Sequence, residues 1–201
     1  ISKANKAFSQ FSESFIEHFW QLNPGYGVYV GFYKYDDVLP IPNAETKQRD
    51  LAFYQQQLAM LNAINPELLS PSNASDFYIL KNQLESGIWS SNELKSGQWN
   101  PSNYNVAGVF GVILNTDYKP LNERLQTIIK RMENIPAYYK AAQQNLINPT
   151  LTHTQLALQQ SAGTAGLFKT SIAEKVKSSS LSAQDKELFA QRLAKTNKAI
   201  N

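Results

Sequence analysis

Four Asn-Pro dipeptides divide this chain, and they constrain its fold more than any other feature of the sequence. They are Asn23-Pro24, Asn65-Pro66, Asn100-Pro101 and Asn148-Pro149. Proline lacks the N–H that a helix interior needs but fits a first helical turn, and asparagine tolerates the backbone conformations at helix ends. The segments between the dipeptides have the apolar spacing of amphipathic helices. The chain is therefore predicted to be all-α, an irregular antiparallel multi-helix bundle of about eight helices.

Apolar residues at three- and four-residue steps locate the expected helices. In the first, residues 3–22, an aromatic stripe predicted to be core is formed by Phe8, Phe11, Phe15 and Phe19. The same spacing predicts helices over residues 43–64, 72–94, 104–114, 121–135, 137–147, 152–176 and 182–200. Residues 34–42 contain Pro40 and Pro42, so they are predicted to form a loop.

Residues 26–32 leave two structures open. Their alternating pattern and β-branched residues favour one short strand at 26–32. Pro24 before them and Gly31 near their end equally frame a two-turn helix.

The predicted domain organisation is a helical lobe over residues 1–177, followed by a linker and terminal helix over 178–201. Three consecutive serines at 178–180 indicate the linker. The last helix reaches Asn201 without a glycine or proline to stop it, so we expect it to continue into a C-terminal lobe missing from this chain. The chain opens on Ile1 rather than methionine, which is expected of a trimmed or processed chain.

Composition excludes several classes of site in this chain. The 201 residues include no cysteine, which excludes disulfides, a thiolate nucleophile and a cysteine-based zinc site. The two histidines, His18 and His153, are far apart and form no His-Glu-x-x-His spacing, so neither a metal site nor a cofactor is predicted here. Neither a Gly-x-Ser-x-Gly nucleophile turn nor a phosphate-binding glycine loop is present. The chain alone is not expected to be an enzyme.

Charge and hydropathy give no support for a nucleic-acid partner or a membrane-spanning helix. The net charge is only +3, and the basic residues near the C-terminus are interspersed with Glu174, Asp185 and Glu187, as on a solvated helix face. No apolar run approaches the roughly 20 residues of a membrane-spanning helix. We therefore expect no nucleic-acid partner.

Three blocks of residues, taken in order and with their spacing, resemble a bacterial family. The first is Phe19-Trp20-x-x-x-Pro24-x-x-x-x-x-x-Gly31 followed by Tyr35-Asp36-Asp37-x-Leu39-Pro40, and the second is Trp99-Asn100-Pro101-x-x-Tyr104. The third is Asp117-Tyr118-x-Pro120-Leu121-x-Glu123-Arg124-Leu125, then Arg131-Met132-x-x-Ile135-Pro136, then Ala142-x-x-Asn145-Leu146-x-x-Pro149. From about residue 10 to 170, the chain resembles the domain-of-unknown-function family numbered eight-eight-five.

This resemblance implies an α-helical protein exported to the bacterial cell envelope, in the periplasm. Many members are lipoproteins, so membrane contact is expected only through a lipid anchor upstream of this chain. Members resemble zinc-dependent peptidases, because their C-terminal half carries a helix of the His-Glu-x-x-x-x-His type. In that chemistry the histidines hold zinc and the glutamate acts as general base on its water. No residue here matches the motif, so no catalytic residue or metal ligand is carried over, and zinc is implied only for the missing lobe.

Two charged pairs are candidates for a substrate-lining or interface role. Asp36 and Asp37 lie in the proline-rich loop, where they either line a cleft or make local turn and cap hydrogen bonds, and the second interpretation is favoured. Arg124 and Arg131 are seven residues apart and share one helical face, which is expected to face outward. They either bind a carboxylate of a substrate or form surface ion pairs, and surface pairing is the default.

Trp99, Asn100 and Tyr104 form a third candidate. Two large aromatic rings with an amide between them suit the binding of an extended peptide. The structural alternative is that Trp99 packs against the helices it connects while Asn100 caps a helix, and this alternative is favoured.

Two functions from different classes follow. The first is the N-terminal helical lobe of a larger exported protein resembling zinc-dependent peptidases, which shapes the substrate cleft and contacts the missing lobe and a peptide substrate. The second is a stand-alone helical domain of the cell envelope that binds a protein or peptide through its many tyrosines and phenylalanines.

Overall fold

The computed structural model describes residues 2–200, and the regular structure in this part of the chain is helical, with no strand. The all-α prediction is thereby confirmed. Internal contacts divide the chain into two compact units. The first comprises the residues up to Leu22 and Ala44–Lys95, and the second comprises Asn23–Asn43 and the residues from Ser96 onward. This division does not coincide with the boundary predicted at residue 177, because the helix that follows residues 178–180 packs within the second unit.

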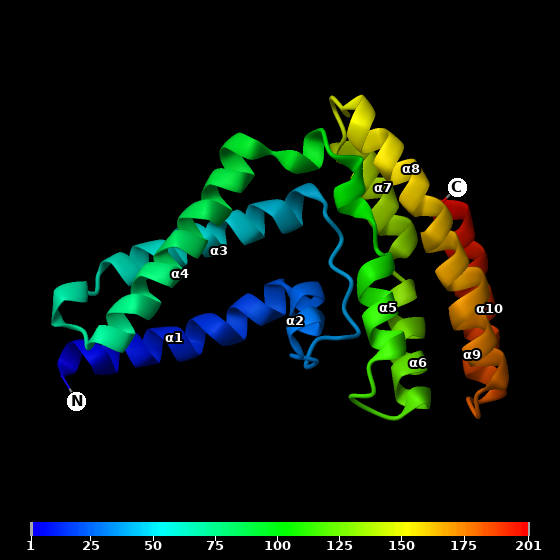
Figure 1. Cartoon of the computed structure of the whole chain (residues 1–201), viewed down its shortest axis with the longest axis horizontal. Coiled ribbons are helices and arrows are strands. Elements are labelled where there is room, and N and C mark those ends of the chain that lie inside the picture. Colours follow the sequence, from blue (N-terminus) through cyan, green and yellow to red (C-terminus); the bar gives the residue numbers. More distant parts are fainter. Residues whose placement is uncertain (1, 201) are drawn as a thin grey trace. The chain divides into compact units, whose positions relative to one another are not determined.

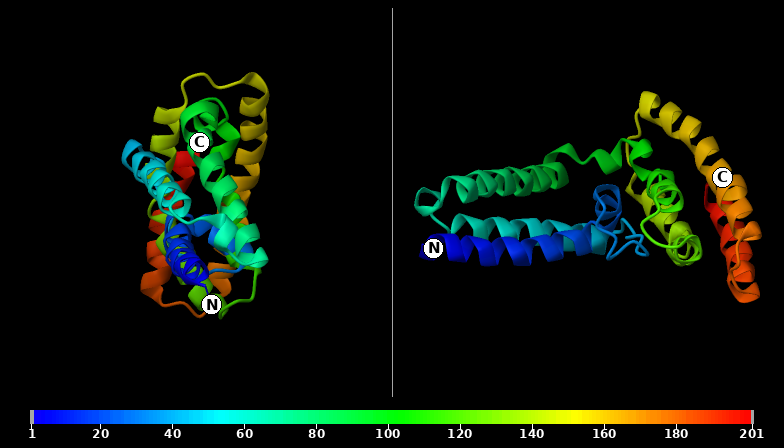
Figure 2. Two further views of the ribbon diagram at one scale, coloured as in Figure 1. Left: turned by 90° about the vertical axis from the view of Figure 1, so that its left-hand side faces the viewer. Right: turned by 60° about the horizontal axis from the view of Figure 1, so that its bottom comes forward.

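Three long helices build the first unit. They are α1 (Lys3–Leu22), α3 (Ala44–Asn62) and α4 (Pro71–Trp89), which contact one another and lie side by side (Figures 1 and 2). A 3-10 helix at Pro66–Leu68 connects α3 to α4, and a π-helical turn at Ser90–Leu94 continues α4. The predicted helices over residues 3–22, 43–64 and 72–94 correspond closely to these elements.

The aromatic stripe of α1 forms the core of the first unit, as its spacing predicts. Its four phenylalanines are at most 8% exposed, and they pack with Leu61, Phe77 and Leu84. Phe15 lies at the centre, with its ring stacked on Phe11 and Phe19 at centroid distances of 5.9 and 5.5 Å. Offset stacking of this kind adds to the free energy gained by burying the rings.

The remaining helices build the second unit. They are α2 (Pro24–Val30), α5 (Ala107–Asn115), α6 (Leu121–Met132), α7 (Ile135–Asn145), α8 (Leu151–Gly166), α9 (Ala173–Ser178) and α10 (Ala183–Ile200). A π-helical segment, Leu167–Ile172, joins α8 to α9 without a break, and α10 packs on α6 and α7 (Figure 1). The helix predicted from residue 104 begins three residues later, because residues 101–104 form a separate 3-10 helix.

The core of the second unit gathers apolar residues from α5, α6 and the π-helical segment. Phe110, Leu125, Ile128 and Phe168 are each 0% exposed, and the rings of Phe110 and Phe168 meet edge to face. Within residues 2–200, no helix combines the length and apolar character that crossing a membrane requires.

Residues 26–32 resolve as the helical alternative rather than a strand. Pro24 occupies the first turn of α2, where its missing N–H costs nothing, and Gly31 ends the helix with φ 86° and ψ 14°. In this left-handed conformation the N–H of Phe32 donates to the carbonyl of Gly27 at 2.8 Å. Glycine is the residue best suited to that position, so the helix must stop there.

Candidate functional site

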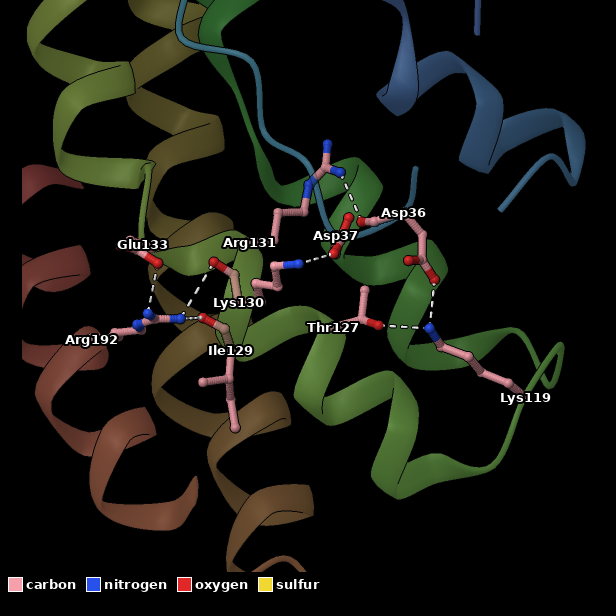
Figure 3. Close-up of polar contacts among 9 residues, drawn as sticks. All are labelled: Asp36, Asp37, Lys119, Thr127, Ile129, Lys130, Arg131, Glu133 and Arg192. Atoms are coloured by element: carbon pink, nitrogen blue, oxygen red, sulfur yellow. Dashed lines mark hydrogen bonds and ion pairs between the residues drawn. The ribbon is translucent and has the colours of Figure 1, made fainter. Parts of the chain in front are cut away.

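The charged residues of the proline-rich loop meet α6 in a network that we call the α6 ion-pair cluster: Asp36, Asp37, Lys119, Lys130 and Arg131. Asp36 Oδ2 accepts from Lys119 Nζ at 2.7 Å, and Lys119 Nζ also donates to Thr127 Oγ1 at 2.6 Å (Figure 3). Asp37 pairs with Lys130, and the Arg131 guanidinium donates to the backbone carbonyl of Asp36 at 2.9 Å. These contacts fasten residues 34–42 to α6.

The ion pair of Asp36 is stronger than that of Asp37, because it is more deeply buried. The Asp36 side chain is 9% exposed and its partner Lys119 is 25% exposed, whereas Lys130 is 69% exposed. Burial lowers the pKa of Arg131 to about 10, although the nearby carboxylates of Asp36 and Asp37 favour its cation. Arg131 therefore remains a cation at neutral pH and depends on the loop for its countercharge.

Tyr118 completes the buried side of the cluster. Its hydroxyl donates to Asp36 Oδ2 at 2.6 Å, and its ring stacks on Tyr33 with centroids 3.7 Å apart. Burial raises the pKa of Tyr118, and the hydrogen bond to the Asp36 carboxylate raises it further. The phenol is therefore held protonated as a donor.

The favoured interpretation of Asp36 and Asp37 as local turn and cap residues is wrong. Their carboxylates pair instead with lysines that lie 83 and 93 residues away along the chain. Each carboxylate gains a charge-assisted hydrogen bond from its lysine, and Asp36 gains a second one from the Tyr118 hydroxyl. Their role in the described residues is to anchor the loop.

The expectation that Arg124 and Arg131 face outward is also wrong, since they are 6% and 2% exposed. Arg124 donates to the carbonyls of Leu114 and Lys119, at 2.5 and 2.9 Å, and pairs with Asp117 at 2.6 Å. The planar guanidinium supplies several donors at once, so it satisfies carbonyls at the end of α5 that otherwise lack a partner. Both arginines stabilise the fold from buried positions, and Arg124 in addition pairs with Asp117, whose side chain is 91% exposed.

Trp99, Asn100 and Tyr104 lie together beside α8. Asn100 accepts from the N–H of Ser102 at 3.1 Å and so caps the 3-10 helix, as the structural alternative predicts. The Trp99 ring meets His153 of α8 edge to face at 5.3 Å. The Tyr104 hydroxyl donates to the carbonyl of Gly97 at 2.8 Å, while its side chain borders a groove.

This groove, which we call the α7–α8 groove, is a concave surface of the second unit. It has a volume of about 320 Å³ and lies between α7, α8, the 3-10 helix and the end of α10. Apolar side chains provide most of its wall, among them Ala142, Leu146 and Ile200. Its position within one unit means that elements of that unit alone define it.

A second hollow adjoins the groove between α7 and α10. It has a volume of about 350 Å³, and we call it the lysine hollow after Lys140, Lys195 and Lys198 on its rim. Tyr139 lines both cavities, and burial raises the pKa of its hydroxyl. Among the described residues, none of the three lysines has an ion-pair partner.

Sequence reasoning missed this hollow, although a signal for it is present. Residues 134–173, which include all of α7 and α8, contain no aspartate or glutamate. Of the three lysines, only Lys140 lies in this stretch, so it has no acidic neighbour close to it along the chain, whereas Lys195 and Lys198 come from α10 and join it only in the fold. For Lys119 no such signal exists, because its partner lies in a distant loop.

The described residues offer no ligand set for a metal ion. Within residues 2–200, no three His, Asp or Glu side chains gather closely enough to hold one. His18 lies on α1 in the first unit, and His153 lies on α8 in the second, where Thr150 Oγ1 is 2.6 Å from its Nδ1.

Comparison with known proteins places this chain among uncharacterised bacterial proteins. The family described as "Bacterial protein of unknown function (DUF885)" matches residues 24–201. The solved structure of "a putative lipoprotein of unknown function from Shewanella oneidensis" is 41% identical and superposes with a TM-score of 0.93. The match covers 96% of this chain but 36% of that one, so this chain spans about a third of its relative's length. A search of the curated proteins gave no match.

Proposed function

This chain belongs to the bacterial DUF885 family, and we propose that it forms a helical lobe of a larger exported protein that resembles zinc-dependent peptidases. The observation that carries this proposal is the difference in coverage: nearly all of this chain matches only 36% of the lipoprotein relative. In this role the lobe shapes the substrate side of the protein. The relative's description also favours a cell-envelope location, with a lipid anchor outside this chain.

The α7–α8 groove is the surface of this lobe best suited to contact a peptide. Peptide sites are concave and mostly apolar, with a few polar groups that fix orientation. The groove combines an apolar wall with the amides of Asn105 and Gln160.

The residues that the structure describes do not fit a zinc site. A catalytic zinc needs three protein ligands, and residues 2–200 bring no such set together. The proposal therefore assigns the metal and the general base to the rest of the larger protein, and it routes no chemical step through this lobe.

The test uses the full-length gene product. We expect about one zinc per chain by elemental analysis and cleavage of a peptide mixture that a chelator abolishes. Leu158→Glu at the rim of the groove should raise KM for cleavage and leave the zinc content unchanged, because Leu158 is 67% exposed and its replacement does not disturb the core. A folded, metal-free preparation that cleaves no peptide would refute the proposal.

The second candidate is a helical domain that binds a protein or peptide without cleaving it. The α7–α8 groove favours this function as well, because an apolar groove can bind a peptide without a metal. Saturable peptide binding by a full-length protein that contains no zinc would select it over the peptidase-like function.

A further inference from the structure

We propose that the α7–α8 groove and the lysine hollow together bind an acidic peptide segment, with its apolar side chains in the groove and its carboxylates against the lysines at one end. This inference gives a chemical class to the peptide contact proposed above, and rests on it only in taking a polypeptide as the occupant. It requires neither zinc nor catalysis.

The two cavities form one continuous surface. Tyr139, Gln143 and Ala199 line both of them, so the apolar groove and the lysine hollow meet along α7 and the end of α10. A segment that lies in the groove therefore passes the lysines at one end. Because the two cavities are continuous, one ligand can contact the apolar groove and the lysines at the same time.

The charge of this surface is uniformly positive. Lys140, Lys195 and Lys198 surround the hollow, and no aspartate or glutamate is among the described residues that line either cavity. The net charge of the whole chain is only +3, so this concentration of unpaired lysines is local. Complementary charge steers an acidic partner to such a surface and suppresses binding of basic ones.

The groove itself offers apolar contacts that are exposed before a ligand binds. Leu158 at its rim is 67% exposed, and Leu146 and Ile200 lie within the wall. Covering such side chains contributes about 25 cal/mol for each Å² of apolar surface removed from water. The ligand is therefore expected to insert apolar side chains here.

A peptide fits this surface better than an anionic membrane does. The surface is hollowed, with an apolar groove that continues into a hollow surrounded by lysines. A peptide is narrow enough to place its side chains in such a groove, whereas a bilayer presents a broad and flat surface. Carboxylates on the same peptide then meet the lysines.

The test measures binding of a short fluorescein-labelled peptide, with a leucine-rich half followed by a glutamate-rich half, by fluorescence anisotropy. The matched peptide carries glutamine at every glutamate position. We expect saturable binding of the acidic peptide, about tenfold weaker binding of the glutamine peptide, and loss of the difference between about 0.05 and 0.5 M salt.

Two sets of variants locate the binding site. The triple variant K140Q/K195Q/K198Q should weaken binding of the acidic peptide about tenfold. The control is K169Q/K175Q/K177Q, which removes the same charge from exposed lysines that line neither cavity. Circular dichroism verifies that both remain folded.

The apolar half is tested by L158E, with the exposed L156E outside the groove as its control. Tighter binding to the wild-type chain than to K140Q/K195Q/K198Q and L158E, with both controls unaffected, supports the proposal. Equal binding of the acidic and glutamine peptides, or equal loss in the test and control variants, overturns it. Binding to phosphatidylserine vesicles without binding to the peptide also overturns it, in favour of a membrane surface. Zinc content and cleavage do not enter this assay, so its failure is distinct from that of the peptidase-like function.

Discussion

Replacing Asp36 by asparagine should destabilise the second unit by about 3 kcal/mol. Asparagine keeps the size of the side chain but removes the charge that faces Lys119 at 2.7 Å and buried Arg131. Breaking a buried ion pair by removing one partner costs about 3–5 kcal/mol, because the other charge is left without compensation. Lys119 is 25% exposed, so water offsets part of the loss and the lower end of that range applies.

Urea unfolding with a reporter in the second unit measures this change. The chain has three tryptophans, and only Trp99 lies in the second unit. In a background of Trp20→Phe and Trp89→Phe, the fluorescence of Trp99 therefore follows that unit alone. With a slope of about 2 kcal/mol per M, the midpoint should fall by about 1.5 M urea.

Asp37→Asn is the matched control, because it removes the same charge from the neighbouring position. Its partner Lys130 is 69% exposed and can be solvated by water, so the midpoint should move much less. Adding Lys119→Met to Asp36→Asn should recover part of the loss, since neither charge is then left alone. Equal shifts for the two aspartates would refute the reasoning that burial makes Asp36 the dominant member of the pair.

Three further predictions test other parts of the structure. Gly31→Ala should lower the free energy of unfolding by about 1–2 kcal/mol, because Gly31 has φ 86°. Gly163→Ala should raise it by up to about 1 kcal/mol, because Gly163 lies in a helix with open space for a methyl group. Thermal unfolding measures both changes. Phe15→Ala should destabilise the first unit by about 3–5 kcal/mol, and hydrogen exchange should show faster exchange in α1, α3 and α4 while the second unit keeps its protection. Burial raises the pKa of Tyr118 and Tyr138, so their contribution to stability is complete below about pH 10 and declines above it. The urea midpoint should therefore fall as the pH rises above about 10, less so when both are replaced by phenylalanine.

The helices could be predicted because their signals are local. Phe8 to Phe19 recur every three or four residues, and that spacing alone defines the buried face of α1. Pro24 and Gly31 likewise determine both ends of α2, although the alternating residues between them left a strand open. In that segment the backbone requirements of proline and glycine outweighed the strand preference of the valines.

The roles of the charged residues could not be predicted, because they depend on contacts across long stretches of chain. Arg131 has the charge and spacing of a surface residue, yet it is 2% exposed and donates to the Asp36 carbonyl, 95 residues away. Helix α10 runs parallel to α6, with contacts from Gln126–Asp185 to Glu133–Arg192, and it helps to decide which face of α6 is covered. No periodicity within α6 encodes this packing. Whether a residue is buried depends on the elements that pack on it, and the residues that form those contacts are distributed over the whole unit.

Two groups of lysines in the second unit are expected to have different roles, one in stability and the other in ligand binding. Lys119 meets its carboxylate within the fold at 2.7 Å, and its removal should therefore affect folding. Lys140, Lys195 and Lys198 surround a hollow to which the fold contributes no carboxylate among the described residues. The lysines around such a concave surface repel one another in the free protein, and a bound anionic ligand reduces this repulsion. The substitutions that weaken binding should accordingly leave stability unchanged or raise it, and the opposite outcome, a loss of stability in K140Q/K195Q/K198Q, would assign these lysines to the fold instead.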